Sequence, residues 1–226
     1  MTVTPASLTR RRLKTPRAAA VAGILFALLY GTSLVLLSLS VPGRLSSDTA
    51  LLATNASTIA LALNLLPFAG IAFLWFIGVI RDRLGDLEDR FFSTVFLGSG
   101  LLFLATTFVG AALAGGLFTS YANASTTTID IGLYNYGRTV MYQIINIYAV
   151  RMAGVFMISL STIWLRTNLM HRGWVILTYA LALVLLLSIG LAIWVILIFP
   201  GWVLVISIYF LIINLRDRSD EVVSEP

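Results

Sequence analysis

The stretch GWVILTYALALVLLLSIGLAIWVILIFPGWVLVISIYFLIIN, residues 173–214, decides the fold of this chain. It contains 42 residues and not one charged side chain. About 20 helical residues cross a hydrocarbon core about 30 Å thick, so the run is long enough for two crossings and too long for one. A turn at Pro200 would leave only 13 residues for the last crossing. We therefore predict a turn near residues 188–190, which gives spans at 173–188 and 191–214 with Pro200 as an internal kink.

Four further apolar runs of spanning length precede this helical hairpin. Of the 226 residues, 59% are apolar and 11% are charged, a balance typical of a protein whose solvent is lipid. None of the runs alternates with period two, so β-barrel strands are excluded and α-helices remain. We therefore predict an all-α, polytopic transmembrane helix bundle, residues 18–215, with six spans at about 18–41, 57–80, 91–117, 141–165, 173–188 and 191–214.

The basic residues predict the orientation of the bundle. Twelve fall in the tails of residues 1–17 and 216–226 or in the two connections on the same side, whereas only Arg44 and Arg138 fall on the other side. Because loops rich in Lys and Arg stay in the cytoplasm, both termini are expected there. Both tails are expected to be disordered. On the outer side, residues 42–56 and 118–140 are expected to be solvated or interfacial.

The chain shows no motif of enzyme chemistry. It has no cysteine, which excludes a disulfide framework, a thiolate nucleophile and a cysteine-ligated metal. His171 is the only histidine and has no potential ligand or catalytic partner nearby in the sequence. No serine-hydrolase elbow, P-loop or dinucleotide fingerprint occurs. We expect no catalysis, no cofactor and no bound metal. The basic residues border the spans, which accounts for them without nucleic-acid binding.

Small residues recur at four-residue spacing in two spans. Positions i and i+4 share one face of a helix, so each series forms a smooth strip along which another helix can approach closely. Two interpretations are open, namely packing within the chain and contact with a partner membrane protein or a second copy. The strips are Ala19, Gly23, Ala27 and Gly31 in the first span, and Thr106, Gly110 and Ala114 in the third.

Arg151 is a lone charge inside the fourth span. A central arginine costs roughly 2.5–3.5 kcal/mol to insert, so its side chain is expected to face the bundle interior or a wet cavity. Tyr148 and Thr162 lie on its side of the helix, Asn64 in the second span is a further candidate for this intramembrane polar cluster, and Asp130 is a possible partner from the outer segment. The cluster is interpreted as a structural clasp or as a site for an anion or lipid headgroup, with snorkelling to the outer surface as a third possibility.

The run IAFLWFIGVIRDRLGDLEDRFF, residues 71–92, together with the six-span plan, resembles a family of uncharacterised bacterial six-span integral membrane proteins. The resemblance covers the hairpin between the second and third spans most clearly. It implies a bacterial inner membrane, and it implies neither an activity nor a functional residue.

Two functions are expected from these patterns. The first is a non-catalytic accessory or structural membrane protein that acts through helix–helix contacts. The alternative is a small carrier or binding protein for an anion or a lipid headgroup, with Arg151 as the receiving charge. A membrane enzyme is the weakest reading, because the spans hold no acid, histidine or serine cluster. The lipid bilayer is the immediate partner in every case.

Overall fold

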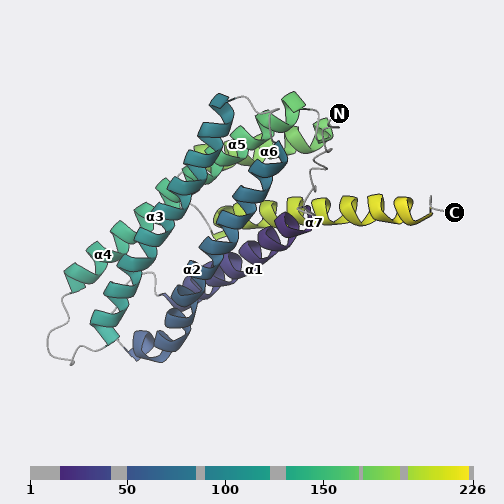
Figure 1. Ribbon diagram of the computed structural model, residues 1–226. Coiled ribbons are helices and arrows are strands. Elements are labelled where there is room, and N and C mark those ends of the chain that lie inside the picture. Colours follow the sequence, from purple (N-terminus) through teal and green to yellow (C-terminus); the bar gives the residue numbers. More distant parts are fainter. Residues whose placement is uncertain are drawn as a thin grey trace, which may run out of the picture.

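The computed structural model describes residues 16–41, 50–84, 90–122, 131–167, 170–188 and 193–223. Within these ranges the chain forms helices and no strand, which confirms the predicted all-α class. The elements are α1 (Pro16–Ser40), α2 (Ala50–Leu84), α3 (Arg90–Ala122), α4 (Ile131–Gln143), the π-helical segment η2 (Ile144–Ala149), α5 (Val150–Thr167), α6 (Arg172–Leu187) and α7 (Ile193–Val223), as Figure 1 shows.

Five helical stretches are long and apolar enough to cross a membrane, which fits a multi-pass membrane protein. They are Ala18–Ser40, Thr54–Asp82, Phe91–Ser120, Gly132–Thr167 and Trp194–Ile212. The remaining helix, α6, is apolar but has only 16 residues. At 1.5 Å per residue it is about 24 Å long, shorter than a hydrocarbon core of about 30 Å.

Several helices extend beyond the expected spans. α2 begins at Ala50, and α3 continues to Ala122. Residues 131–140 were expected in a solvated or interfacial connection, but they form α4, which continues through η2 into α5. Residues 216–223 were expected in a disordered tail, but they are the last turns of α7, whereas residues 1–15 lie outside the described part. Hydropathy marks where a chain leaves lipid, and backbone hydrogen bonds can continue a helix past that point.

Neighbouring helices run antiparallel. Ser33 Oγ of α1 donates to the Ala62 carbonyl of α2 over 2.7 Å, and Asn55 Nδ2 donates to the Ser40 carbonyl over 3.2 Å. Residue numbers therefore rise along α1 as they fall along α2. The same holds between α1 and α7, where a Cβ on Gly23 would contact Ser207, whereas Leu34 and Ile196 line one crevice. The first and last helices are thus neighbours, although most of the chain lies between them.

An aromatic cluster fills the core between α1, α2, α3, α5 and α7. The ring centroid of Phe73 lies 4.6 Å from that of Phe26 and 5.3 Å from those of Phe103 and Phe156. Phe199 of α7 completes the cluster, 4.8 Å from Phe103. Each such pair contributes about 0.5–1.5 kcal/mol beyond area burial. Because lipid is as apolar as these side chains, close packing rather than exclusion from water drives their association.

Polar groups join α6 to its neighbours. The hydroxyls of Thr162 in α5 and Tyr179 in α6 lie 2.7 Å apart. The single histidine, His171, is the N-cap of α6, and its Nδ1 accepts a hydrogen bond from the Gly173 amide over 3.2 Å. This cap satisfies one of the amides that every helix start leaves unpaired.

Candidate functional site

The strip on α1 is used mainly for packing inside the chain. Ala19 and Ala27 are buried. A Cβ added to Gly23 would collide with Ser207 Oγ and would lie 2.8 Å from the Phe76 ring, so α2 and α7 both approach this glycine closely. Gly31 differs, because nothing lies within 4 Å of its Cβ position.

The strip on α3 faces the fourth span. A Cβ on Gly110 would lie 2.5 Å from Ile145 Cγ1 in η2, and Ala114 is fully buried. Thr106, however, turns its hydroxyl back to its own helix and donates to the Leu102 carbonyl over 2.7 Å. Both strips therefore bring helices of this chain together.

Arg151 is the second residue of α5 and is half-buried. Within the described part of the chain its guanidinium makes no hydrogen bond or ion pair. Asn64 is exposed on α2, the side chain of Tyr148 is 59% exposed, and Thr162 bonds to α6 as described above. Asp130 lies outside the described residues. No hydrogen bond joins the described members, so the cluster around Arg151 stays a prediction.

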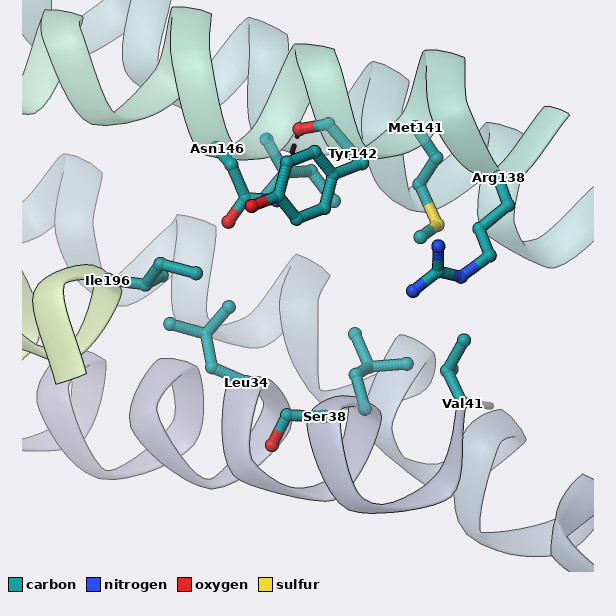
Figure 2. A pocket seen from close by; sticks show the side chains of 10 residues that line it. Leu34, Ser38, Val41, Arg138, Met141, Tyr142, Asn146 and Ile196 are labelled. Carbon is teal, nitrogen blue, oxygen red and sulfur yellow. Dashed lines mark hydrogen bonds between the residues drawn. The ribbon is translucent and has the colours of Figure 1, made fainter. Parts of the chain in front are cut away.

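A crevice lies elsewhere, between the C-terminal half of α1 and the α4–η2 segment. Its volume is about 250 Å³. Figure 2 shows side chains from the two segments facing each other across it, with Ile196 of α7 at one end and Arg138 towards the other. The lining residues are Leu34, Leu37, Ser38, Val41, Arg138, Met141, Tyr142, Ile145, Asn146 and Ile196.

Two polar groups in the crevice are buried and unpaired among the described residues. One is Nε of Arg138, and the other is Oδ1 of Asn146. The amide nitrogen of Asn146 is satisfied, because it donates to the Tyr142 carbonyl over 3.0 Å. A buried donor or acceptor without a partner costs about 1–3 kcal/mol, and more when it is charged. The two groups therefore favour a ligand or water that pairs with them.

The local helix geometry explains why these residues meet in one crevice. Arg138, Tyr142 and Asn146 are spaced four apart, so they lie along one side of a helix. From Ile144 to Ala149 the backbone is π-helical, a rare conformation found often at functional sites. From its place in the sequence, Arg138 was expected only as a charge in the outer connection. The four-residue spacing from Arg138 to Asn146 was the signal that could have found this side of the crevice.

A groove lies between α1 and α2. It has a volume of about 320 Å³ and apolar walls. Trp75 on its rim is 67% exposed, and Phe68 is 62% exposed. The lining residues are Ala18, Val21, Ala22, Leu25, Leu29, Phe68, Ile71, Ala72 and Trp75.

Neither the protein-family models nor the curated proteins nor the solved structures include a significant match to this chain.

Proposed function

We propose that this chain is a non-catalytic multi-pass protein of a bacterial inner membrane that acts through helix–helix contacts, by pairing with a second copy along the groove between α1 and α2. The groove is the observation that carries the proposal. One of its walls is a ridge of Phe68, Ile71 and Trp75, which follow helical spacing and are 53–67% exposed. A ridge beside a groove on one surface suits an isologous two-fold interface, because the ridge of each copy can pack into the groove of the other.

Disulfide crosslinking tests this pairing, because the chain has no cysteine of its own. Phe68→Cys, Ile71→Cys and Trp75→Cys each introduce a single thiol on the ridge. Oxidation in native membranes is expected to give a covalent dimer for at least one of them. Trp194→Cys is the matched control, since Trp194 is 75% exposed on α7 and does not line the groove. Crosslinking no stronger on the ridge than at position 194 would contradict the proposal.

The proposal includes a membrane topology of six crossings with both termini in the cytoplasm. The antiparallel pairing of α1 with α7 supports termini on the same side. α6 runs back along α5, with Gly154 facing Ala182 and Thr162 meeting Tyr179, which supports α6 as the short fifth crossing. The resemblance of residues 71–92 supports the bacterial inner membrane.

Labelling of single cysteines tests the orientation. Ser7→Cys, Ser125→Cys and Ser219→Cys would be treated in intact cells with a membrane-impermeant maleimide. Only position 125 is expected to react, and all three should react once the membrane is permeabilised. Labelling of either terminus in intact cells would overturn the cytoplasmic placement.

A second candidate function is the binding or carriage of an anion or lipid headgroup at Arg151. The observation that favours it is the half-buried guanidinium without a hydrogen bond to any described residue. Arg151→Cys would be labelled with the same maleimide and compared with Ser125→Cys. Labelling at 151 that an added anion suppresses supports an anion site on a wet path. Labelling only at 125, in a folded 151 variant, supports the structural clasp.

A further inference from the structure

We infer that the crevice between α1 and the α4–η2 segment holds an anionic membrane lipid, with the headgroup phosphate on Arg138 and the start of an acyl chain directed towards Ile196. This site is separate from the groove proposed for pairing and from Arg151, since neither Arg151 nor any groove residue lines it.

Charge complementarity identifies the headgroup. Among the residues that the structure describes, Arg138 is the only charged side chain that lines the crevice, and none of the lining residues is a carboxylate. Its Nε is buried and has no hydrogen-bond partner among the described residues. A guanidinium presents a planar fork of N–H groups that matches the oxygens of a phosphate, and such charge-assisted bonds are roughly twice as strong as neutral ones. Because the described lining offers a guanidinium and no carboxylate to hold a choline or ammonium group, it favours a headgroup with net negative charge.

The walls identify the rest of the ligand. Apart from Arg138, the lining is mostly apolar, with Leu34, Leu37 and Val41 on one side and Met141 and Ile145 on the other. A dry apolar cavity of about 150 Å³ is large enough to accept benzene. The crevice, at about 250 Å³, therefore has room for a headgroup phosphate and the first carbons of one chain.

The order of residues along the crevice sets the direction of the lipid. Arg138 lies towards Val41, near the end of α1, whereas Asn146 lies towards Leu34 and Ile196, as Figure 2 shows. The charge thus lies beside the end of α1, and the apolar walls continue inward from it, which is the order of headgroup and chain in a bilayer. The unpaired Asn146 Oδ1 offers an acceptor deeper in the crevice, for a water that can donate in turn to an ester oxygen of the lipid.

The test is a lipid titration of the full chain, purified and delipidated in a neutral detergent and followed by thermal unfolding. Phosphatidylglycerol is expected to raise the unfolding midpoint at lower concentration than phosphatidylcholine, because a ligand that binds only the folded state stabilises it. Arg138→Gln is expected to raise the half-saturating concentration of phosphatidylglycerol about tenfold or more. Arg172→Gln is the control, because Arg172 is exposed at the start of α6 and does not line the crevice, and it is expected to leave that concentration unchanged.

Four outcomes would overturn the inference. They are equal responses to the two lipids, an unchanged response in Arg138→Gln, an equal loss in Arg172→Gln, and full stabilisation by inorganic phosphate. In the last case the crevice would hold a free anion rather than a lipid. If Arg138→Gln does not fold, Leu34→Phe decides, since it keeps the charge and adds bulk where Leu34 points into the crevice (Figure 2). Loss of the phosphatidylglycerol preference in that variant supports the site, and an unchanged preference overturns it.

Discussion

Trp202 donates its indole N–H to Thr178 Oγ1 over 3.0 Å, and both side chains are buried in the interior of the bundle. The Thr178 hydroxyl in turn donates to the Trp174 carbonyl one turn earlier, over 2.8 Å. Every polar hydrogen of this pair is satisfied, and the bond ties the short helix α6 to α7.

Thr178→Val tests how much this hydrogen bond contributes to the free energy of unfolding. The substitution keeps the shape of the side chain but leaves the Trp202 N–H without an acceptor in a low-dielectric interior. We expect a loss of about 1–2 kcal/mol in the free energy of unfolding. Thr106→Val is the control, because the Thr106 hydroxyl bonds only to carbonyls of its own helix. Unfolding in mixed micelles with increasing SDS measures both. Equal losses in the two variants would show that the interhelical bond contributes nothing.

Two glycines of α1 form a matched pair for a packing test. Gly23 is in close contact with Ser207 and Phe76, whereas Gly31 has open space around its Cβ position. Gly23→Val is expected to lower the free energy of unfolding by about 1–3 kcal/mol through overpacking. Gly31→Val makes the same change in intrinsic helix propensity and is expected to change the free energy of unfolding by less than about 0.5 kcal/mol. The same SDS titration compares them. A Gly31 variant as unstable as the Gly23 variant would contradict the packing of α1 against α2 and α7.

Asn146→Leu tests whether the Oδ1 of Asn146 gains a hydrogen-bond partner when lipid binds in the crevice. In delipidated protein the substitution removes the buried, unpartnered Oδ1, so the unfolding midpoint is expected to stay level or to rise. With phosphatidylglycerol present, the stabilisation by lipid is expected to be smaller than in the unaltered chain, because the water-mediated hydrogen bond between Asn146 and the lipid is lost. Thermal unfolding with and without the lipid measures both effects. An equal lipid response in the two proteins would remove Asn146 from the site.

The π-helical segment is expected to accommodate one residue while Arg138 keeps its direction into the crevice. A π-turn holds about one residue more than an α-turn, so deletion of Ile147 should return the backbone to α geometry and leave α4 in nearly the same angular position relative to α5. The deletion variant is then expected to keep its helical circular dichroism and its phosphatidylglycerol preference. Deletion of both Ile147 and Tyr148 removes a second residue, turns α4 by about 100° and is expected to abolish the preference, although Arg138 is still present. Equal lipid preference in the two deletion variants would show that the angular position of α4 does not matter for the site.

The all-α class and the long apolar helices were predictable from sequence because lipid leaves the backbone few alternatives. A chain in hydrocarbon must pair its own amides and carbonyls, so uncharged runs of about 20 residues become helices. α6 ends at Leu187 and α7 begins at Ile193, whereas residues 189–190 of the turn expected near 188–190 lie outside the described part of the chain. The spacing of small residues predicted close approach, and Gly23 and Gly110 show it, but the pattern could not tell that Gly31 would have no neighbour.

The crevice was not predictable from sequence, for two physical reasons. Its walls come from α1 and from the α4–η2 segment, about a hundred residues apart, and no local pattern records that these two faces meet. The π-helical hydrogen bonds of residues 144–149 also have no signature in composition. Hydropathy consequently treated Arg138 as a loop charge, because it reports the polarity of a segment and not the direction in which a helix presents each side chain.

The pairing of α1 with α7 also has a consequence for biosynthesis. Ser207, which packs against Gly23, is translated roughly 180 residues later. At about 5–20 residues per second, α1 waits on the order of 10–40 s for its last neighbour. α2 can cover one side of α1 soon after it is made, since their contacts are local. The side of α1 that receives α7 stays uncovered until synthesis is nearly complete. Completion of the bundle is therefore a late event. A ribosome stalled before α7 leaves a nascent chain in which one side of the first helix has no packing partner.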